Sequence, residues 1–260
     1  MKPNLSLEIE GATVRFGGVV AVSEVSMTVD VGEVVGLIGP NGAGKTSLLN
    51  SISRLVPLSA GSVHVFGQNI TKIAPYMLPR HGVARTFQVV QPFANLTLRE
   101  NVAIAAMFSS KSLPKLEAMD RADAVLERTG LTHKAKMLPA EVTLADRKRL
   151  EVSRALAMTP KLLLLDEVMA GLNHTEMDAM IHLIRELQQE GTSIVVVEHV
   201  MKAIVAVCNR IIVMQNGKKI ADGNPTSVLN DPTVVAAYLG QRYVDRQSKT
   251  QSASVSGVQK

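Results

Sequence analysis

Hydrophobic and polar positions alternate over residues 5–35, with glycines between the alternating stretches. A period of two is typical of strands with one buried face, so this pattern predicts an antiparallel β layer at the start of the chain. The segment 62–70, set off by Gly61 and Gly67, predicts further short strands. The sequence therefore begins with a mostly β region.

Short apolar runs occupy residues 34–38, 162–165 and 193–197. Apolar residues at helical spacing lie between them, at 48–56 and 177–187. Strands that are buried on both faces and alternate with helices are typical of a parallel sheet. The pattern therefore predicts an α/β fold with a mainly parallel central sheet.

A helical region interrupts this alternation. Three segments with few strand signals carry apolar positions at helical spacing, at 96–107, 115–129 and 147–158. We therefore expect an α-helical insert at 89–158 in an α/β core made of residues 1–88 and 159–243.

The C-terminal part predicts a hairpin and a polar tail. Residues 211–214 and 218–221 flank Gln215-Asn216-Gly217, and Asn-Gly between two such runs favours a tight turn. Beyond about Tyr243 the sequence is rich in Ser, Gln and Lys, so we expect disorder over 244–260.

Composition and charge narrow the class of protein. Of the 260 residues, 46% are hydrophobic, which is enough for a sizeable core, but only 3% are aromatic and none is Trp. Aromatic platforms for single-stranded nucleic acid are therefore scarce, and the net charge of +5 is spread along the chain. We expect no nucleic-acid partner.

Cysteine usage and hydropathy bear on the compartment. Cys208 is the only cysteine, so no intrachain disulfide can form and a reducing compartment is expected. The apolar runs are too short to span a bilayer, and Glu8 and Glu10 stand where a signal peptide needs an apolar core. We expect a chain that is neither exported nor embedded in a membrane.

The strongest chemical signal is a phosphate-binding loop. Residues 39–46 read Gly-Pro-Asn-Gly-Ala-Gly-Lys-Thr, which fits GxxxxGK[ST], and they lie between a predicted strand and a predicted helix. In such a loop backbone N–H groups point at the phosphates, the lysine reaches the β/γ oxygens and the hydroxyl coordinates Mg²⁺. The expected nucleotide-binding residues are Gly39, Pro40, Asn41, Gly42, Ala43, Gly44, Lys45, Thr46 and Ser47.

Further polar residues follow the other predicted strands. Asp166 and Glu167 end the second apolar run, and His199 follows the third. The carboxyl ends of parallel strands meet at the sheet edge where ligands bind in α/β folds. We expect Asp166 to hold Mg²⁺, Glu167 to orient or deprotonate the attacking water, and His199 to contact the γ-phosphate. Gln88, where the core passes into the insert, is a further candidate ligand of Mg²⁺ or water.

With these motifs the chain resembles the nucleotide-binding subunit of an ATP-binding-cassette (ABC) transporter over about residues 5–240. The phosphate loop corresponds to Walker A, Gln88 to the Q-loop, residues 162–167 to Walker B and His199 to the switch histidine. The resemblance implies a P-loop NTPase with a RecA-like core, an antiparallel β subdomain and an inserted α-helical subdomain. It also implies ATP hydrolysis with Mg²⁺, with catalytic residues Glu167, His199 and Gln88 and metal-binding residues Thr46, Gln88 and Asp166.

Four shorter stretches resemble the branched-chain amino-acid uptake subfamily. They are Arg85-Thr86-Phe87-Gln88, Ala170-Gly171-Leu172-Asn173, Glu198-His199-Val200-Met201 and Ala237-Tyr238-Leu239-Gly240. The resemblance implies an importer of hydrophobic amino acids, with Phe16 stacking on adenine. The implied partners are a second ABC ATPase subunit, transmembrane permeases and, indirectly, a periplasmic or extracellular solute-binding protein. The implied location is peripheral, on the cytoplasmic face of the inner (plasma) membrane.

The signature segment departs from the family pattern. ABC subunits carry a motif usually written LSGGQ, which contacts ATP held by the opposing subunit, and residues 142–146 here read Val-Thr-Leu-Ala-Asp. We expect Thr143 and Ala145 to make that contact, although Ala145 adds a methyl group and Asp146 a negative charge near the phosphates. These variants are compatible with a homodimer. They also suggest a heterodimer with two unequal sites, which is the hypothesis we favour.

Two other functions fit part of the sequence. A soluble cassette ATPase acting on ribosomes or DNA usually carries two cassettes or a long coiled-coil insert, and the sequence shows neither. A regulatory nucleotide-binding subunit with weak hydrolysis fits the altered signature but not the intact Glu167 and His199. Within transport, a lipopolysaccharide-export cassette shares Tyr238-Leu239-Gly240, whereas Arg85-Thr86-Phe87-Gln88 favours amino-acid uptake.

Overall fold

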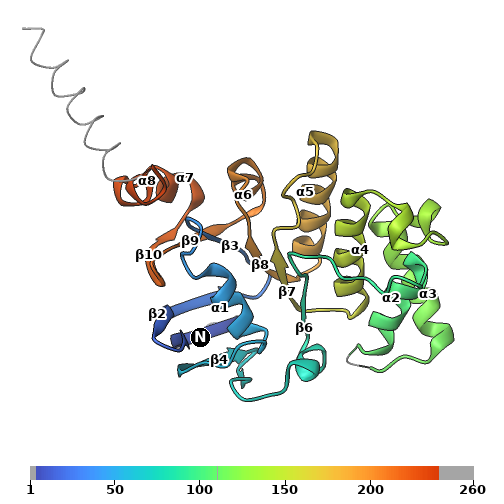
Figure 1. The fold of residues 1–260 in the computed structure, drawn as a ribbon, viewed down its shortest axis with the longest axis horizontal. Helices are drawn as coiled ribbons and strands as arrows, with labels where there is room; N and C mark the ends of the chain where they lie inside the picture. Colours follow the sequence, from blue (N-terminus) through green and yellow to red (C-terminus); the bar gives the residue numbers. More distant parts are fainter. Residues whose placement is uncertain (1–3, 110, 240–260) are drawn as a thin grey trace, which may run out of the picture.

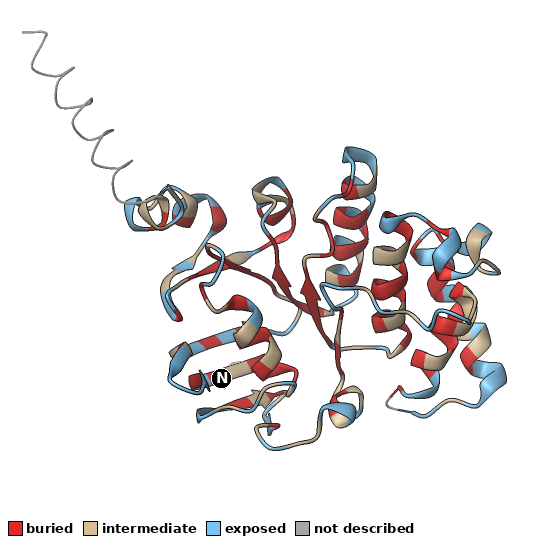
Figure 2. Ribbon diagram, in the orientation of Figure 1, coloured by how far each residue is buried: buried red, intermediate tan, exposed pale blue. Residues whose placement is uncertain are grey.

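The computed structural model describes residues 4–109 and 111–239 (Figure 1). Its larger sheet has six strands in the order β10-β9-β3-β8-β7-β6, of which all but β10 run parallel. The strands are β3 (Val34–Ile38), β6 (Val83–Arg85), β7 (Leu162–Asp166), β8 (Ser193–Val197), β9 (Arg210–Gln215) and β10 (Lys218–Gly223). Every residue of β3, β7 and β8 is buried, as the apolar runs predict (Figure 2).

The two faces of the larger sheet pack against different layers. One face packs against α5 (His174–Gln189), α6 (Met201–Val207) and the helical insert, and the other against α1 (Lys45–Ile52) and a smaller sheet (Figure 1). Since side chains alternate along a strand, the neighbours Leu163 and Leu164 belong to these two separate cores. The larger sheet is therefore the shared wall of both cores.

The smaller sheet is antiparallel throughout, which confirms the predicted β layer. Its strands, in the order β2-β1-β4-β5, are β1 (Leu5–Phe16), β2 (Val19–Asp30), β4 (Ala60–Val65) and β5 (Gln68–Asn69). Buried and exposed positions alternate along much of β2, as expected for a strand that covers one face of a core.

The helical insert consists mainly of α2 (Leu98–Met107), α3 (Lys115–Arg128) and α4 (Leu144–Ala157). Their apolar residues form one core with those of α5 and the adjacent face of the larger sheet. The start of α4 lies before the predicted position at Arg147, because the Thr143 side chain accepts a hydrogen bond from the helix backbone and caps it there. The insert is thus a three-helix layer at the side of the larger sheet.

Several short elements are not predicted by the hydrophobic pattern. They include β6, α6, three 3₁₀ segments at Pro75–His81, Thr132–Lys134 and Pro139–Glu141, α7 (Pro225–Leu229) and α8 (Pro232–Leu239). Gly240, Tyr243 and the expected tail at 244–260 lie outside the described residues. Over the residues that the structure does describe, no helix has the length and apolar character needed to cross a bilayer.

Candidate functional site

The predicted phosphate loop connects β3 to α1 at the carboxyl edge of the larger sheet. Gly39, Gly42 and Gly44 have φ angles of 148°, 78° and 99°, which side-chain-bearing residues rarely adopt. A β-carbon on Gly39 would lie 2.1 Å from the carbonyl oxygen of Met214, and one on Gly44 would lie 2.4 Å from that of Ala21. The loop therefore requires glycine where it passes against β9 and β2.

Lys45 is the first residue of α1, and its ammonium group turns back onto the loop. Its Nζ donates hydrogen bonds to the carbonyl oxygens of Gly39 at 2.7 Å and Pro40 at 3.0 Å. Burial lowers the pKa of Lys45, while the nearby Glu167 and Asp166 oppose this shift. The lysine is thus held at the mouth of the loop by contacts that an anion would replace.

Asp166 ends β7 and is almost fully buried. Its Oδ2 accepts a hydrogen bond from Arg85 at 2.8 Å, and Arg85 also donates to Asn50 Oδ1 at 2.7 Å and Ser53 Oγ at 2.6 Å. Burial raises the pKa of Asp166, and Arg85 opposes this shift. The other oxygen, Oδ1, is buried and has no hydrogen-bond partner among the described residues, so it can still accept a ligand.

Glu167 follows Asp166 in a strained conformation. Its φ is +52°, a left-handed value that costs of order 1–3 kcal/mol for a residue other than glycine and persists only where surrounding contacts hold it. Its carboxylate contacts Gln88 Nε2 at 2.8 Å and His199 Nε2 at 2.6 Å. The three predicted catalytic residues therefore form one hydrogen-bonded group.

Two neighbouring cavities contain most of the predicted site. One of about 390 Å³ is lined by residues 41–47 of the phosphate loop together with Gln88, Glu167 and His199. The other, of about 400 Å³, shares Thr46 and Gln88 with the first and adds Asp166. Residues from four separate segments of the sequence therefore converge beside the phosphate loop.

Three predicted contacts lie elsewhere. Phe16, at the end of β1, lines neither cavity and is 51% exposed. Thr143 and Ala145, at the start of α4, also line neither. The positions of Thr143 and Ala145 outside both cavities are as expected if they serve a nucleotide held by another subunit.

The Asp146 side chain of the signature segment is hydrogen-bonded within the helical insert. The Asp146 carboxylate turns inward, and its Oδ2 accepts hydrogen bonds from the Thr143 hydroxyl at 2.7 Å and Lys134 Nζ at 2.6 Å. Burial would raise the pKa of Asp146, but these hydrogen bonds outweigh it and hold the pKa below its ordinary value. The Ala145 side chain is buried in the core of the insert. The added charge is therefore paired with Lys134, and the added methyl group packs within the insert.

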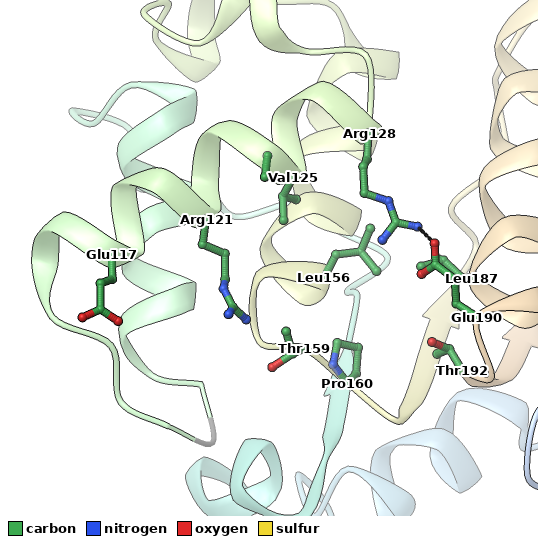
Figure 3. Close-up of a pocket in the computed structure, with 11 residues that line it drawn as sticks. Glu117, Arg121, Val125, Arg128, Leu156, Thr159, Pro160, Leu187, Glu190 and Thr192 are labelled. Atoms are coloured by element: carbon green, nitrogen blue, oxygen red, sulfur yellow. Dashed lines mark hydrogen bonds and ion pairs between the residues drawn. The ribbon is translucent and has the colours of Figure 1, made fainter.

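A separate cavity of about 530 Å³ lies away from the phosphate loop, between α3, the end of α4 and the end of α5 (Figure 3). An ion pair between Arg128 of the insert and Glu190 of the core, at 2.8 Å, lies beside it. None of the predicted site residues lines this cavity.

Three residues of the site network carry no sequence prediction of a role. Arg85 stands in one of the subfamily stretches, and it pairs with Asp166. Lys148 donates to the backbone carbonyl of Glu167, and Glu198 accepts from the backbone N–H of Met169. Arg85 and Glu198 could have been found as charged residues next to the Gln88 and His199 motifs. Lys148 is distant from Glu167 in the sequence, and only the folded structure brings the two together.

Comparison with known proteins extends the similarity beyond the site. The family model described as ABC transporter matches residues 22–170, and the one described as branched-chain amino acid ATP-binding cassette transporter matches residues 218–244. The high-affinity branched-chain amino acid transport ATP-binding protein LivG of Escherichia coli (strain K12) is 36% identical over 249 residues, which cover 90% of this chain and 98% of LivG.

Two further comparisons reach similar lengths. The lipopolysaccharide export system ATP-binding protein LptB of Haemophilus influenzae is 33% identical over 222 residues, covering 85% of this chain and 92% of LptB. A crystal structure of the ADP conformation of a cassette from an ABC transporter has a TM-score of 0.81 and 30% identity, over 91% of this chain and 99% of that one. The shared fold therefore includes the core and the helical insert.

Proposed function

The chain belongs to the ABC transporter ATP-binding family and is a transport ATPase, and on this basis we propose that it is the ATP-hydrolysing subunit of an importer for branched-chain or related hydrophobic amino acids. The observation that supports this most directly is the contact of the Glu167 carboxylate with Gln88 and His199 beside the phosphate loop. The substrate class rests on the names of relatives such as LivG and on the C-terminal family model.

In the proposed site the phosphate loop binds ATP through its backbone N–H groups. Lys45 leaves the carbonyls of Gly39 and Pro40 and pairs with the β/γ-phosphate oxygens. Phe16 is the proposed adenine contact. Since Gly39 and Gly44 cannot carry a β-carbon without a clash, the backbone path that binds the phosphates is built into the fold.

The residues present fit a Mg²⁺ ion. Asp166 Oδ1 is buried without a partner among the described residues, and Thr46 and Gln88 line the same cavity, so three oxygen donors of the kind that Mg²⁺ prefers surround one space. We assign Thr46, Gln88 and Asp166 as the residues that hold Mg²⁺, which when bound neutralises charge on the phosphates.

Glu167 is the proposed base. Its carboxylate faces the cavity, where it can orient a water molecule and accept its proton, and His199 and Gln88 fix the orientation of that carboxylate. The positions of Thr143 and Ala145 away from this cavity support a site completed by the signature segment of a second ATPase subunit.

Glu167→Gln tests the role of the carboxylate in the transporter complex that contains the full-length chain. We expect retained ATP binding and arrested turnover. Identification of the proteins that co-purify from detergent-solubilised membranes tests the partners, which we expect to be permeases and a second ATPase on the cytoplasmic face of the membrane. Recovery of only ribosomal or DNA-bound partners would overturn the transport function.

The second ATPase is proposed to be a different chain, because the signature segment 142–146 of this chain is altered while its phosphate loop and Glu167 are intact. Single-turnover hydrolysis in the reconstituted dimer, with wild type compared with Asp146→Gln, tests this point. We expect unequal rates at the two sites of the wild type and a smaller difference in the variant. Equal rates at both sites in the wild type would rule out the heterodimer.

A further inference from the structure

Lys148 of α4 reaches out of the helical insert to the loop that follows β7. The side chain is half-buried, and its Nζ donates hydrogen bonds to the backbone carbonyl of Glu167 at 2.8 Å and to that of Ala170. These two carbonyls bracket the loop at 167–170. A single cationic side chain therefore spans the segment that begins with the proposed base.

The same loop is also fixed from the core. The N–H of Glu167 donates to the carbonyl of Val197 at 2.9 Å, and the N–H of Met169 donates to the buried carboxylate of Glu198 at 2.6 Å. Val197 ends β8 and Glu198 follows it, whereas Lys148 belongs to the insert. The left-handed φ of Glu167 is thus held between the core on one side and α4 on the other.

The position of Lys148 on its helix matters because α4 also begins with the signature segment. Thr143 caps α4, and Lys148 lies five residues later, which is about 7.5 Å along a helix at 1.5 Å per residue. About one and a half turns of helix therefore separate the segment proposed to meet the partner's nucleotide from the side chain that holds the carbonyl of Glu167.

We propose that Lys148 is a positioning residue, which fixes Glu167 in its catalytic orientation and links the signature end of α4 to the base of this chain's own site. This proposal rests on the proposed function of Glu167. A shift of α4 when the signature segment meets a nucleotide moves Lys148, and through the Glu167 carbonyl it moves the carboxylate beside Gln88 and His199. The two ATP sites of a dimer are coupled through this contact.

The chain offers a matched control, since a second cation also joins the insert to the core. Arg128 pairs with Glu190 at 2.8 Å beside the cavity in Figure 3, with 38% and 55% of their side chains exposed. Glu190 follows the far end of α5, a helix of 16 residues that is about 24 Å long, so this pair is remote from the loop at 167–170. Removing Arg128 cuts an insert-to-core contact without touching Glu167.

The experiment compares Lys148→Met, Lys148→Arg and Arg128→Met in the purified transporter complex that contains the full-length chain. We measure kcat, affinity for a fluorescent ATP analogue, and amide hydrogen exchange over residues 167–173 and 144–157. For Lys148→Met we expect kcat to fall about 10- to 100-fold, the effect of misplacing a catalytic group by about 1 Å, with ATP affinity within about twofold of wild type. Exchange at 167–173 should rise while exchange at 144–157 stays unchanged.

Lys148→Arg keeps donors for both carbonyls and should restore kcat to within about threefold of wild type, and Arg128→Met should match wild type in all three measurements. The proposal is overturned if Lys148→Met leaves kcat or the exchange at 167–173 unchanged, or if it lowers ATP affinity and kcat in equal measure. Failure of the proposed function gives a different result. A wild-type complex without ATPase activity would contradict the proposed function, and an active Glu167→Gln variant would contradict the assignment of Glu167 as the base.

Discussion

Arg85→Met removes the cation from the buried ion pair next to the proposed metal site. The side chains of Arg85 and Asp166 are only 6% and 2% exposed, and Arg85 also donates to Asn50 and Ser53 of the α1 region. Methionine keeps most of the volume but provides no donor. The substitution therefore leaves the carboxylate of Asp166 buried without its only charged hydrogen-bond partner among the described residues.

The expected loss of stability follows from this burial. Breaking a buried ion pair by removing one partner costs about 3–5 kcal/mol, because the remaining charge is neither solvated nor paired. At about 2–4 °C per kcal/mol for a chain of this size, the thermal midpoint should fall by roughly 6–20 °C. Thermal unfolding of the full-length protein at about pH 8, without nucleotide or Mg²⁺, measures this change.

The loss of stability should also depend on pH with a definite sign. Burial raises the pKa of Asp166 and Arg85 opposes the rise, so removing Arg85 raises the pKa further. A carboxyl group with a higher pKa in the folded than in the unfolded state binds more protons when folded, so its unfavourable effect grows as pH rises and fades as pH falls. Arg85→Met should lie closer to wild type at about pH 5.5 than at about pH 8.

Two controls make the prediction refutable. Arg99→Met breaks the pair with Asp123, whose side chains are 35% and 51% exposed, and such surface pairs contribute only about 0–1 kcal/mol. The double variant Arg85→Met/Asp166→Asn removes both charges and should recover part of the lost stability. The reasoning fails if Arg85→Met is no less stable than Arg99→Met, or if its deficit grows at the lower pH.

Three further predictions concern single side chains. Lys45→Ala should abolish ATP binding in equilibrium dialysis while leaving the thermal midpoint nearly unchanged, since among the described residues Lys45 Nζ donates hydrogen bonds to two loop carbonyls only. Glu167→Gln should bind ATP normally but lower kcat by about 10²-fold or more, and undiminished phosphate release would contradict the assignment. Burial raises the pKa of the Cys208 thiol to about 12, so only about 10⁻⁴ of the thiol is ionised at about pH 8. A thiol reagent should therefore react slowly with the folded protein and rapidly only after denaturation.

The fold and most of the site could be predicted because their signals are local. The phosphate loop is a fixed pattern of glycines, and the positive φ angles of Gly39 and Gly44 show why that pattern is required. Asp166 and His199 could be placed near it because the ends of neighbouring parallel strands meet at one sheet edge. The short strand β6 and the helix α6 could not be predicted, since a few residues carry no clear period.

Contacts that depend on tertiary packing could not be predicted from the sequence. Nothing in the chain between Lys148 and Glu167 indicates that a lysine inside the insert holds the carbonyl of that glutamate. The pairing of Asp146 with Lys134 likewise could not be predicted, because it depends on how the segment before α4 folds back on the helix start. A residue's charge is visible in the sequence, but the partner that compensates it is not.

This pairing changes how the altered signature should act on a partner's ATP. The Asp146 charge is compensated by Lys134, whereas the Thr143 hydroxyl donates to Asp146 and is less available as a donor to phosphate. Asp146→Gln should therefore raise single-turnover hydrolysis at the partner's site by freeing a hydrogen bond. A short-range hydrogen bond is little affected by salt, whereas charges separated by more than about 3 Å are screened at 1 M. The gain should persist between about 0.1 M and 1 M salt, and a gain confined to low salt would show that the charge of Asp146 acts on the nucleotide after all.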